Sequence, residues 1–230
     1  IEGENVMSRI ERSKEKYEQL FKTEQKLDPN DPELMSQLQW FIFGEVFYIG
    51  KLTDKQRELI TCTILTVLQT LPQLKAHVNA ALNVEVSPLE LKEAIYQCAP
   101  FIGYPKTLNA ISVVNEVFNQ RNITLPLENQ CDFADDQRYE QGLKIQKELY
   151  GDEIKERYQY LPEEIANALP KFLTEWCFGD CYSRKAMDIK TRELLIFCVL
   201  TALNATGQLY SHALGNLKVG NSLDILYAAL

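Results

Sequence analysis

Residues 51–86 determine the fold, because the chain contains this stretch twice. They read KLTDKQRELITCTILTVLQTLPQLKAHVNAALNVEV, and residues 186–221, 135 positions later, read AMDIKTRELLIFCVLTALNATGQLYSHALGNLKVGN. The two histidines of the chain fall on equivalent positions of the two copies. A repeat that keeps its register over this length predicts two copies of one structural unit. The positions identical in both copies include Arg57 and Arg192, Glu58 and Glu193, and His77 and His212.

The repeated stretch has the signals of two consecutive helices. Thr53 followed by Gln56 is a capping box, and apolar residues then fall on nearly every helical face as far as about Leu71. Pro72 marks the start of a second, amphipathic helix, and Ser87-Pro88 with Glu90 marks the start of another. No segment alternates like a strand between turns, so the sequence predicts an all-α fold.

The repeat also predicts the domain organisation. We expect a first unit with an N-terminal helix over residues 1–118, a linker over 119–137 and a second unit over 138–230. The second unit lacks a counterpart of the last helical segment of the first. Either the native chain continues, or a neighbour supplies the missing packing.

Composition excludes several classes of function. The net charge of −8, with no basic cluster, argues against nucleic acid as a partner. No apolar run reaches the roughly 18 residues of a membrane span, and no signal peptide is visible. None of the 6 cysteines forms a C-x-x-C pair, and 2 isolated histidines do not make a zinc site. We therefore expect a cytoplasmic protein with reduced thiols and no metal.

The polar residues inside the apolar repeat are candidates for chemistry. Glu58 lies early in one helix and His77 lies on the next, so antiparallel packing would bring them together, and Glu193 and His212 likewise. A carboxylate that orients an imidazole is a common acid/base unit. The adjacent Arg57 and Arg192 are candidates to bind an anionic substrate or to cap a structural ion pair. A structural role for the Glu–His pairs is equally consistent with the spacing, because Glu is favoured in the first turns of a helix and such a bond can tie two helices together.

The motifs resemble those of the carboxymuconolactone decarboxylase family. The resemblance is carried by TDKQRELI with LKAHVNAALN, by DIKTRELL with LYSHALGNL, by APFIGYPKTLNA at 99–110 and by RYEQGL at 138–143. It implies two tandem all-helical units with the alkylhydroperoxidase D-like fold, no cofactor, and a homo-oligomer such as a trimer of two-unit chains.

The family has two chemical branches. The alkylhydroperoxidase D branch uses a C-x-x-C pair between its Glu and its His, and those positions here hold Thr70 and Gln73, and Ala205 and Gln208. A dithiol peroxidase needs both thiols, so the sequence counts against that activity. The resemblance therefore implies a carboxy-lyase acting on a small carboxylated lactone or related acid, with Glu58, His77, Glu193 and His212 catalytic, and with Tyr104 a candidate pocket residue beside the arginines.

Two other hypotheses remain open. One is a peroxide-handling enzyme of the same family that uses other cysteines, for example Cys62 or Cys98. The other is a non-catalytic oligomeric binding protein that keeps only the fold. The sequence identifies neither the substrate nor the copy that is active.

Overall fold

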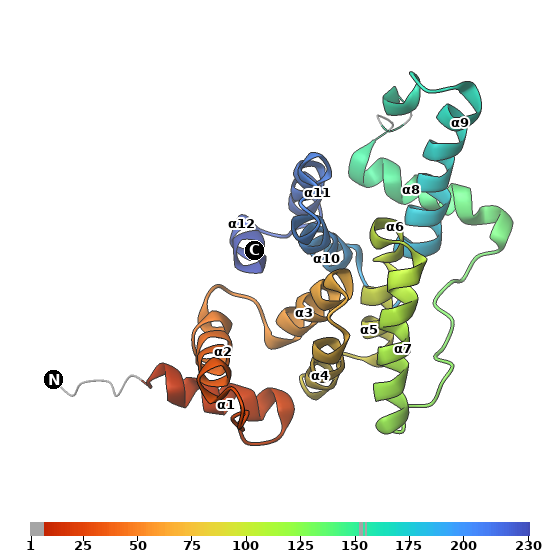
Figure 1. Ribbon diagram of the computed structural model, residues 1–230. Coiled ribbons are helices and arrows are strands. Elements are labelled where there is room, and N and C mark those ends of the chain that lie inside the picture. The colour runs from red at the N-terminus through yellow and green to blue at the C-terminus, as the bar shows by residue number, and fades with distance from the viewer. Residues whose placement is uncertain (1–6, 152–153, 155) are drawn as a thin grey trace.

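The computed structural model describes residues 7–151, 154 and 156–230. Helices account for most of this part of the chain, and it contains no strand, which confirms the all-α prediction. The α-helices, coloured from red to blue in Figure 1, are α1 (Arg9–Phe21), α2 (Pro32–Gly44), α3 (Asp54–Leu68), α4 (Leu71–Asn83), α5 (Pro88–Tyr96), α6 (Ala99–Ile102), α7 (Tyr104–Gln120), α8 (Arg138–Tyr150), α9 (Glu163–Phe172), α10 (Ile189–Ala202), α11 (Thr206–Lys218) and α12 (Leu223–Ala229). Short 3₁₀ turns cover Val46–Tyr48, Asp135–Gln137 and Glu156–Tyr158, and a π-helix covers Leu173–Tyr182.

Local signals set most of the helix boundaries. The capping boxes predicted at Thr53 and Ser87 both form, with each side chain accepting from the backbone N–H three residues on. Helix α3 ends at Leu68, earlier than predicted, because Gln69 takes a left-handed conformation with φ 59°. Asp31, the residue before α2, makes no capping hydrogen bond with its side chain.

Helices α3 and α10 pack against each other at the centre of the molecule (Figure 1). They belong to equivalent positions of the two repeats, and each packs on the helix that follows it, α4 or α11. Every residue of α10 from Arg192 to Leu200 is buried, as expected for a helix that is apolar all round. In the view of Figure 1, α1 and α2 lie at one end of this centre, and α8 and α9 lie toward the other.

Matching glycines let the outer helices approach closely. A Cβ added to Gly44 would lie 2.1 Å from the Arg9 carbonyl oxygen, and one added to Gly179 would lie 2.5 Å from that of Arg138. Only glycine allows so close a contact between backbones. The same crossing therefore occurs in both repeats, between α1 and α2 and between α8 and the π-helix.

The hydrophobic core crosses the predicted boundary between the units. Cys98 and Val67 from the first repeat are buried in one cluster with Phe178 and Ile196 of the second, and Phe101 packs against it. The segment that follows α5 thus covers part of the second repeat. None of the described helices has both the length and the apolar character to cross a membrane.

Candidate active site

Each repeat brings its glutamate and histidine together. In the first, Glu58 on α3 lies 2.8 Å through Oε2 from Nδ1 of His77 on α4. In the second, Glu193 on α10 lies 3.1 Å through Oε2 from Nδ1 of His212 on α11. Both carboxylates are fully buried, whereas the His77 and His212 side chains keep 18% and 15% of their surface exposed. The geometry expected from the spacing is therefore present twice, with a buried acid behind a histidine that reaches the surface.

Two tyrosines join the pair in the second repeat. The Tyr150 hydroxyl donates to Glu193 Oε2 at 2.6 Å and lies 2.9 Å from His212 Nδ1. The Tyr182 hydroxyl donates to the other carboxylate oxygen, Oε1, at 2.8 Å. Both oxygens of this buried carboxylate thus have a donor, as burial of a charge requires.

Phenylalanines take the place of both tyrosines in the first repeat. Phe21 contacts His77 edge-on with ring centroids 5.7 Å apart. Tyr150 contacts His212 with ring centroids 5.2 Å apart and the two rings tilted by 57°. Phe47 occupies the position of Tyr182, and a chain of aromatic contacts runs from it through Phe43 to Phe21. Glu58 Oε1 has no hydrogen-bond partner among the described residues. The two sites share a carboxylate and an imidazole but differ in the hydroxyls around them.

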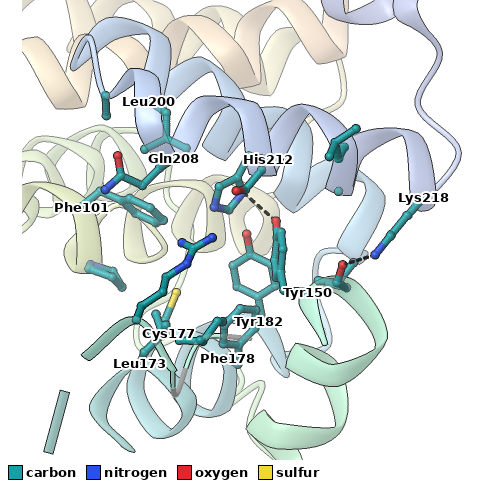
Figure 2. A pocket seen from close by; sticks show the side chains of 18 of the residues that line it. Phe101, Tyr150, Leu173, Cys177, Phe178, Tyr182, Leu200, Gln208, His212 and Lys218 are labelled. Atoms are coloured by element: carbon teal, nitrogen blue, oxygen red, sulfur yellow. Dashed lines mark hydrogen bonds between the residues drawn. The ribbon is translucent and has the colours of Figure 1, made fainter. Parts of the chain in front are cut away.

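A cavity of about 690 Å³ opens beside His212. Figure 2 shows Tyr150, Tyr182 and Phe101 around the imidazole. Such a volume is in the range of small-molecule sites. Phe101 comes from α6 and its ring lies 6.3 Å from that of His212, so the first repeat supplies one wall of the second repeat's cavity.

Among the described residues, the charged side chains that line the cavity are those of Arg157, Lys218 and His212. None of these described lining residues is an aspartate or a glutamate. Lys218 Nζ donates to the Leu149 carbonyl oxygen at 2.8 Å. Arg157 is exposed, and no described residue accepts a hydrogen bond from it. The sequence analysis missed both residues. Arg157 lies outside the repeated stretch, and Lys218 lies within it but has Asn83 at the equivalent position of the first copy.

The arginines predicted to bind substrate lie away from this cavity. Arg192 is fully buried and pairs with Glu93 of α5 at 2.9 Å. Arg57 donates to the Val46 and Ile49 carbonyl oxygens and lies under the Phe47 ring. Both arginines are therefore held by protein groups, and the contacts are those of the structural alternative rather than of a substrate carboxylate.

The predicted pocket residue Tyr104 also lies elsewhere. It is 57% exposed and stacks on Trp176 with ring centroids 5.4 Å apart, and it is absent from the cavity lining.

The thiols near the cavity are poor candidates for redox chemistry. Ala205 and Gln208, at the positions of the C-x-x-C pair of the peroxidase branch, line the cavity. Cys177 also lines it, but burial raises the pKa of this thiol, and burial raises the pKa of Cys181 to about 12. A thiol that stays protonated is a weak nucleophile. The described residues contain no group of three or more His, Cys, Asp or Glu placed to hold a metal ion.

Comparisons with known proteins identify a family and several relatives of this chain. A model of the carboxymuconolactone decarboxylase family matches residues 32–116, which include Glu58 and His77. The 4-carboxymuconolactone decarboxylase of Acinetobacter baylyi is 34% identical over 83 residues, 36% of this chain and 62% of that protein. The nitrosuccinic acid decarboxylase npaB of Metarhizium robertsii is 30% identical over 87 residues, 38% of this chain and 59% of that protein.

A third relative, an uncharacterized 15.0 kDa protein of Paracoccus denitrificans, is 32% identical over 100 residues, 43% of this chain and 72% of that protein. The chain spans about three fifths of the length of the two decarboxylases it matches. The family match, the helical fold and the buried Glu–His pairs lead to one conclusion: the chain belongs to the carboxymuconolactone decarboxylase family.

Proposed function

We propose that the second repeat is a carboxy-lyase site, in which Glu193 and His212 protonate the carbon left by decarboxylation of a small carboxylic acid. The observation that carries the proposal is the opening of the Glu193–His212 pair into a cavity whose other described charged groups, Arg157 and Lys218, are cationic. The names of the two decarboxylases that the chain resembles support the same class of reaction.

The pair is suited to delivering a proton. His212 Nδ1 faces Glu193 and Tyr150, so Nε2 is the nitrogen left for a substrate. In the proposed step, the bond between the substrate carbon and its carboxylate breaks, carbon dioxide leaves, and the electron pair passes into an adjacent carbonyl such as that of a lactone. The imidazolium of His212 then gives the Nε2 proton to that carbon, and water returns a proton to the ring.

Cationic groups hold the acid in this proposal. Arg157 and Lys218 replace Arg57 and Arg192 as the groups that bind substrate carboxylates, because they line the cavity. Arg157 has no hydrogen-bond acceptor among the described residues, and a guanidinium can pair with a carboxylate in a bidentate manner.

Carbon dioxide release tests the proposal. The purified chain would be given 4-carboxymuconolactone or nitrosuccinic acid, and His212→Ala would be compared with His77→Ala. We expect turnover of at least one acid, a loss of roughly 10²-fold or more in His212→Ala, as for removal of a general acid, and little change in His77→Ala. Absence of carbon dioxide with both acids, or a loss confined to His77→Ala, would contradict it.

The proposed quaternary structure is a homo-oligomer, with a trimer as the first expectation. Tyr210, Leu214 and Tyr227 on α11 and α12 leave 70%, 44% and 67% of their surface exposed, and exposed apolar groups of this size favour an interface. Light scattering would test it: a trimer has three times the 26.5 kDa mass of the chain, and a monomer mass would refute it.

A further inference from the structure

The Tyr150 hydroxyl connects the carboxylate and the imidazole of the second repeat. It lies 2.6 Å from Glu193 Oε2 and 2.9 Å from His212 Nδ1. The hydroxyl has one proton to give, and the carboxylate can only accept, so the shorter contact is Tyr150 donating to Glu193. The Tyr150 oxygen is then free to accept the N–H of His212 Nδ1.

This arrangement fixes which nitrogen of His212 carries the inner proton. With acceptors at both Tyr150 and Glu193, the Nδ1–H form is the favoured tautomer, and Nε2 is directed to the substrate side. Burial, together with the nearby Glu193 charge, raises the pKa of Tyr150, so its hydroxyl remains a donor throughout the working range of pH.

Tyr182 holds the Glu193 carboxylate in the orientation that its contact with Tyr150 requires. Its hydroxyl is 2.8 Å from Glu193 Oε1, and the residue is 3% exposed. With one tyrosine on each oxygen, the carboxylate cannot rotate without breaking a buried hydrogen bond.

The first repeat is an internal comparison for the role of these hydroxyls. The Phe21 ring packs on His77 as the Tyr150 ring packs on His212, and Phe47 stands 135 positions before Tyr182 in the sequence. Glu58 contacts His77 directly at 2.8 Å. The bond that links α3 to α4 is kept without either hydroxyl. A Glu–His contact between the two helices therefore forms without tyrosine hydroxyls. Holding the helices together does not account for Tyr150 and Tyr182 in the second repeat.

We propose that Tyr150 is a positioning residue for proton transfer, which holds the His212 imidazole between Glu193 and the cavity, and that the phenylalanine-lined pair of the first repeat ties helices together without acting on substrate. This inference rests on the proposed decarboxylase function.

The test uses the fact that the chain has only 2 histidines, one in each site. Protein labelled with ¹⁵N-histidine gives two imidazole spectra, which report the tautomer of each ring. We expect Tyr150→Phe to shift the His212 signals and leave those of His77 in place, and Phe21→Tyr to shift those of His77 alone. This readout needs no substrate, so it stands or fails separately from the decarboxylase proposal.

Kinetics provide the second readout. With a substrate in hand, Tyr150→Phe should lower kcat by roughly tenfold or more, as for loss of the partner that orients a functional histidine, while KM changes by less than about twofold. Tyr160→Phe, which removes a hydroxyl from a side chain 82% exposed, is the control and should match the wild type. An unchanged kcat in Tyr150→Phe, or unchanged His212 signals, would overturn the inference.

Discussion

Replacing Tyr182 by phenylalanine should destabilise the protein by removing one hydrogen bond from a buried charge. Tyr182 is 3% exposed, and its hydroxyl is the donor to Glu193 Oε1 at 2.8 Å. The substitution keeps the ring and deletes only the oxygen, so packing changes little. It leaves Glu193 Oε1 in the state that Glu58 Oε1 already has, buried and without a partner among the described residues.

The magnitude follows from the cost of that unpaired oxygen. Leaving a buried acceptor without its donor costs about 1–3 kcal/mol. For a chain of this size, each kcal/mol lowers the melting temperature by roughly 2–4 °C, so Tyr182→Phe should melt about 2–12 °C below the wild type. The reciprocal change, Phe47→Tyr, offers Glu58 Oε1 a donor and should stabilise by up to about 1 kcal/mol.

Equilibrium unfolding in urea measures both changes directly. The free energy of unfolding and the slope m would be fitted for the wild type, Tyr182→Phe and Phe47→Tyr, with the exposed Tyr160→Phe as the control. A value for Tyr182→Phe within about 0.5 kcal/mol of the wild type would refute the reasoning, because surface substitutions change stability by that much.

Three further predictions concern pH, thiols and backbone contact. Burial raises the pKa of Glu90, but hydrogen bonds from Lys55 and the helix cap outweigh it and hold the pKa below its usual value. The stabilisation from Glu90 is therefore present at pH 7 and lost as pH falls through the folded-state pKa. Glu90→Gln should cost about 0.5–1 kcal/mol at pH 7 and almost nothing once the pH is below that pKa, as measured by urea unfolding. Native protein at pH 8 should take up one equivalent of iodoacetamide by mass spectrometry, at Cys131, because the other five thiols are buried; additional labels would contradict this. Gly142→Ala would place a carbon 2.0 Å from a backbone oxygen and should lower the melting temperature by several degrees, whereas Gly207→Ala meets nothing within 4 Å and should not.

The sequence predicted the parts of the fold that local chemistry determines. The capping boxes at Thr53 and Ser87 and the pairing of Glu58 with His77 were read correctly, because each depends on spacing within one or two helices. Because the glutamate and the histidine recur at the same positions of the second copy, the sequence also predicted that Glu193 lies beside His212.

The tyrosines escaped the sequence analysis for a different reason in each case. Tyr182 is 135 positions from Phe47, in the register of the repeat, but it lies in the π-helix outside the most similar stretch. Tyr150 is 129 positions from Phe21, because the connection between these helices and the next is six residues longer in the second repeat. Comparison at the fixed spacing of 135 therefore could not align Tyr150 with Phe21.

The ion-pair partner of Arg192 could not be predicted from the repeat. Arg57 and Arg192 lie in similar stretches, KQRELI and KTRELL. Arg192 nevertheless pairs with Glu93, whose equivalent 135 positions later is Ala228. The partner comes from the other repeat, so inspection of either copy alone gives no sign of it.

The ion pair between Glu93 and Arg192 makes each half of the chain dependent on the other. Both side chains are at most 1% exposed, and removing one partner of a buried pair costs about 3–5 kcal/mol. The second repeat expressed alone would lose Glu93 and also the Phe101 wall of its cavity. We therefore expect the two copies to unfold in a single transition, and neither copy to reach its native stability when it is expressed without the other.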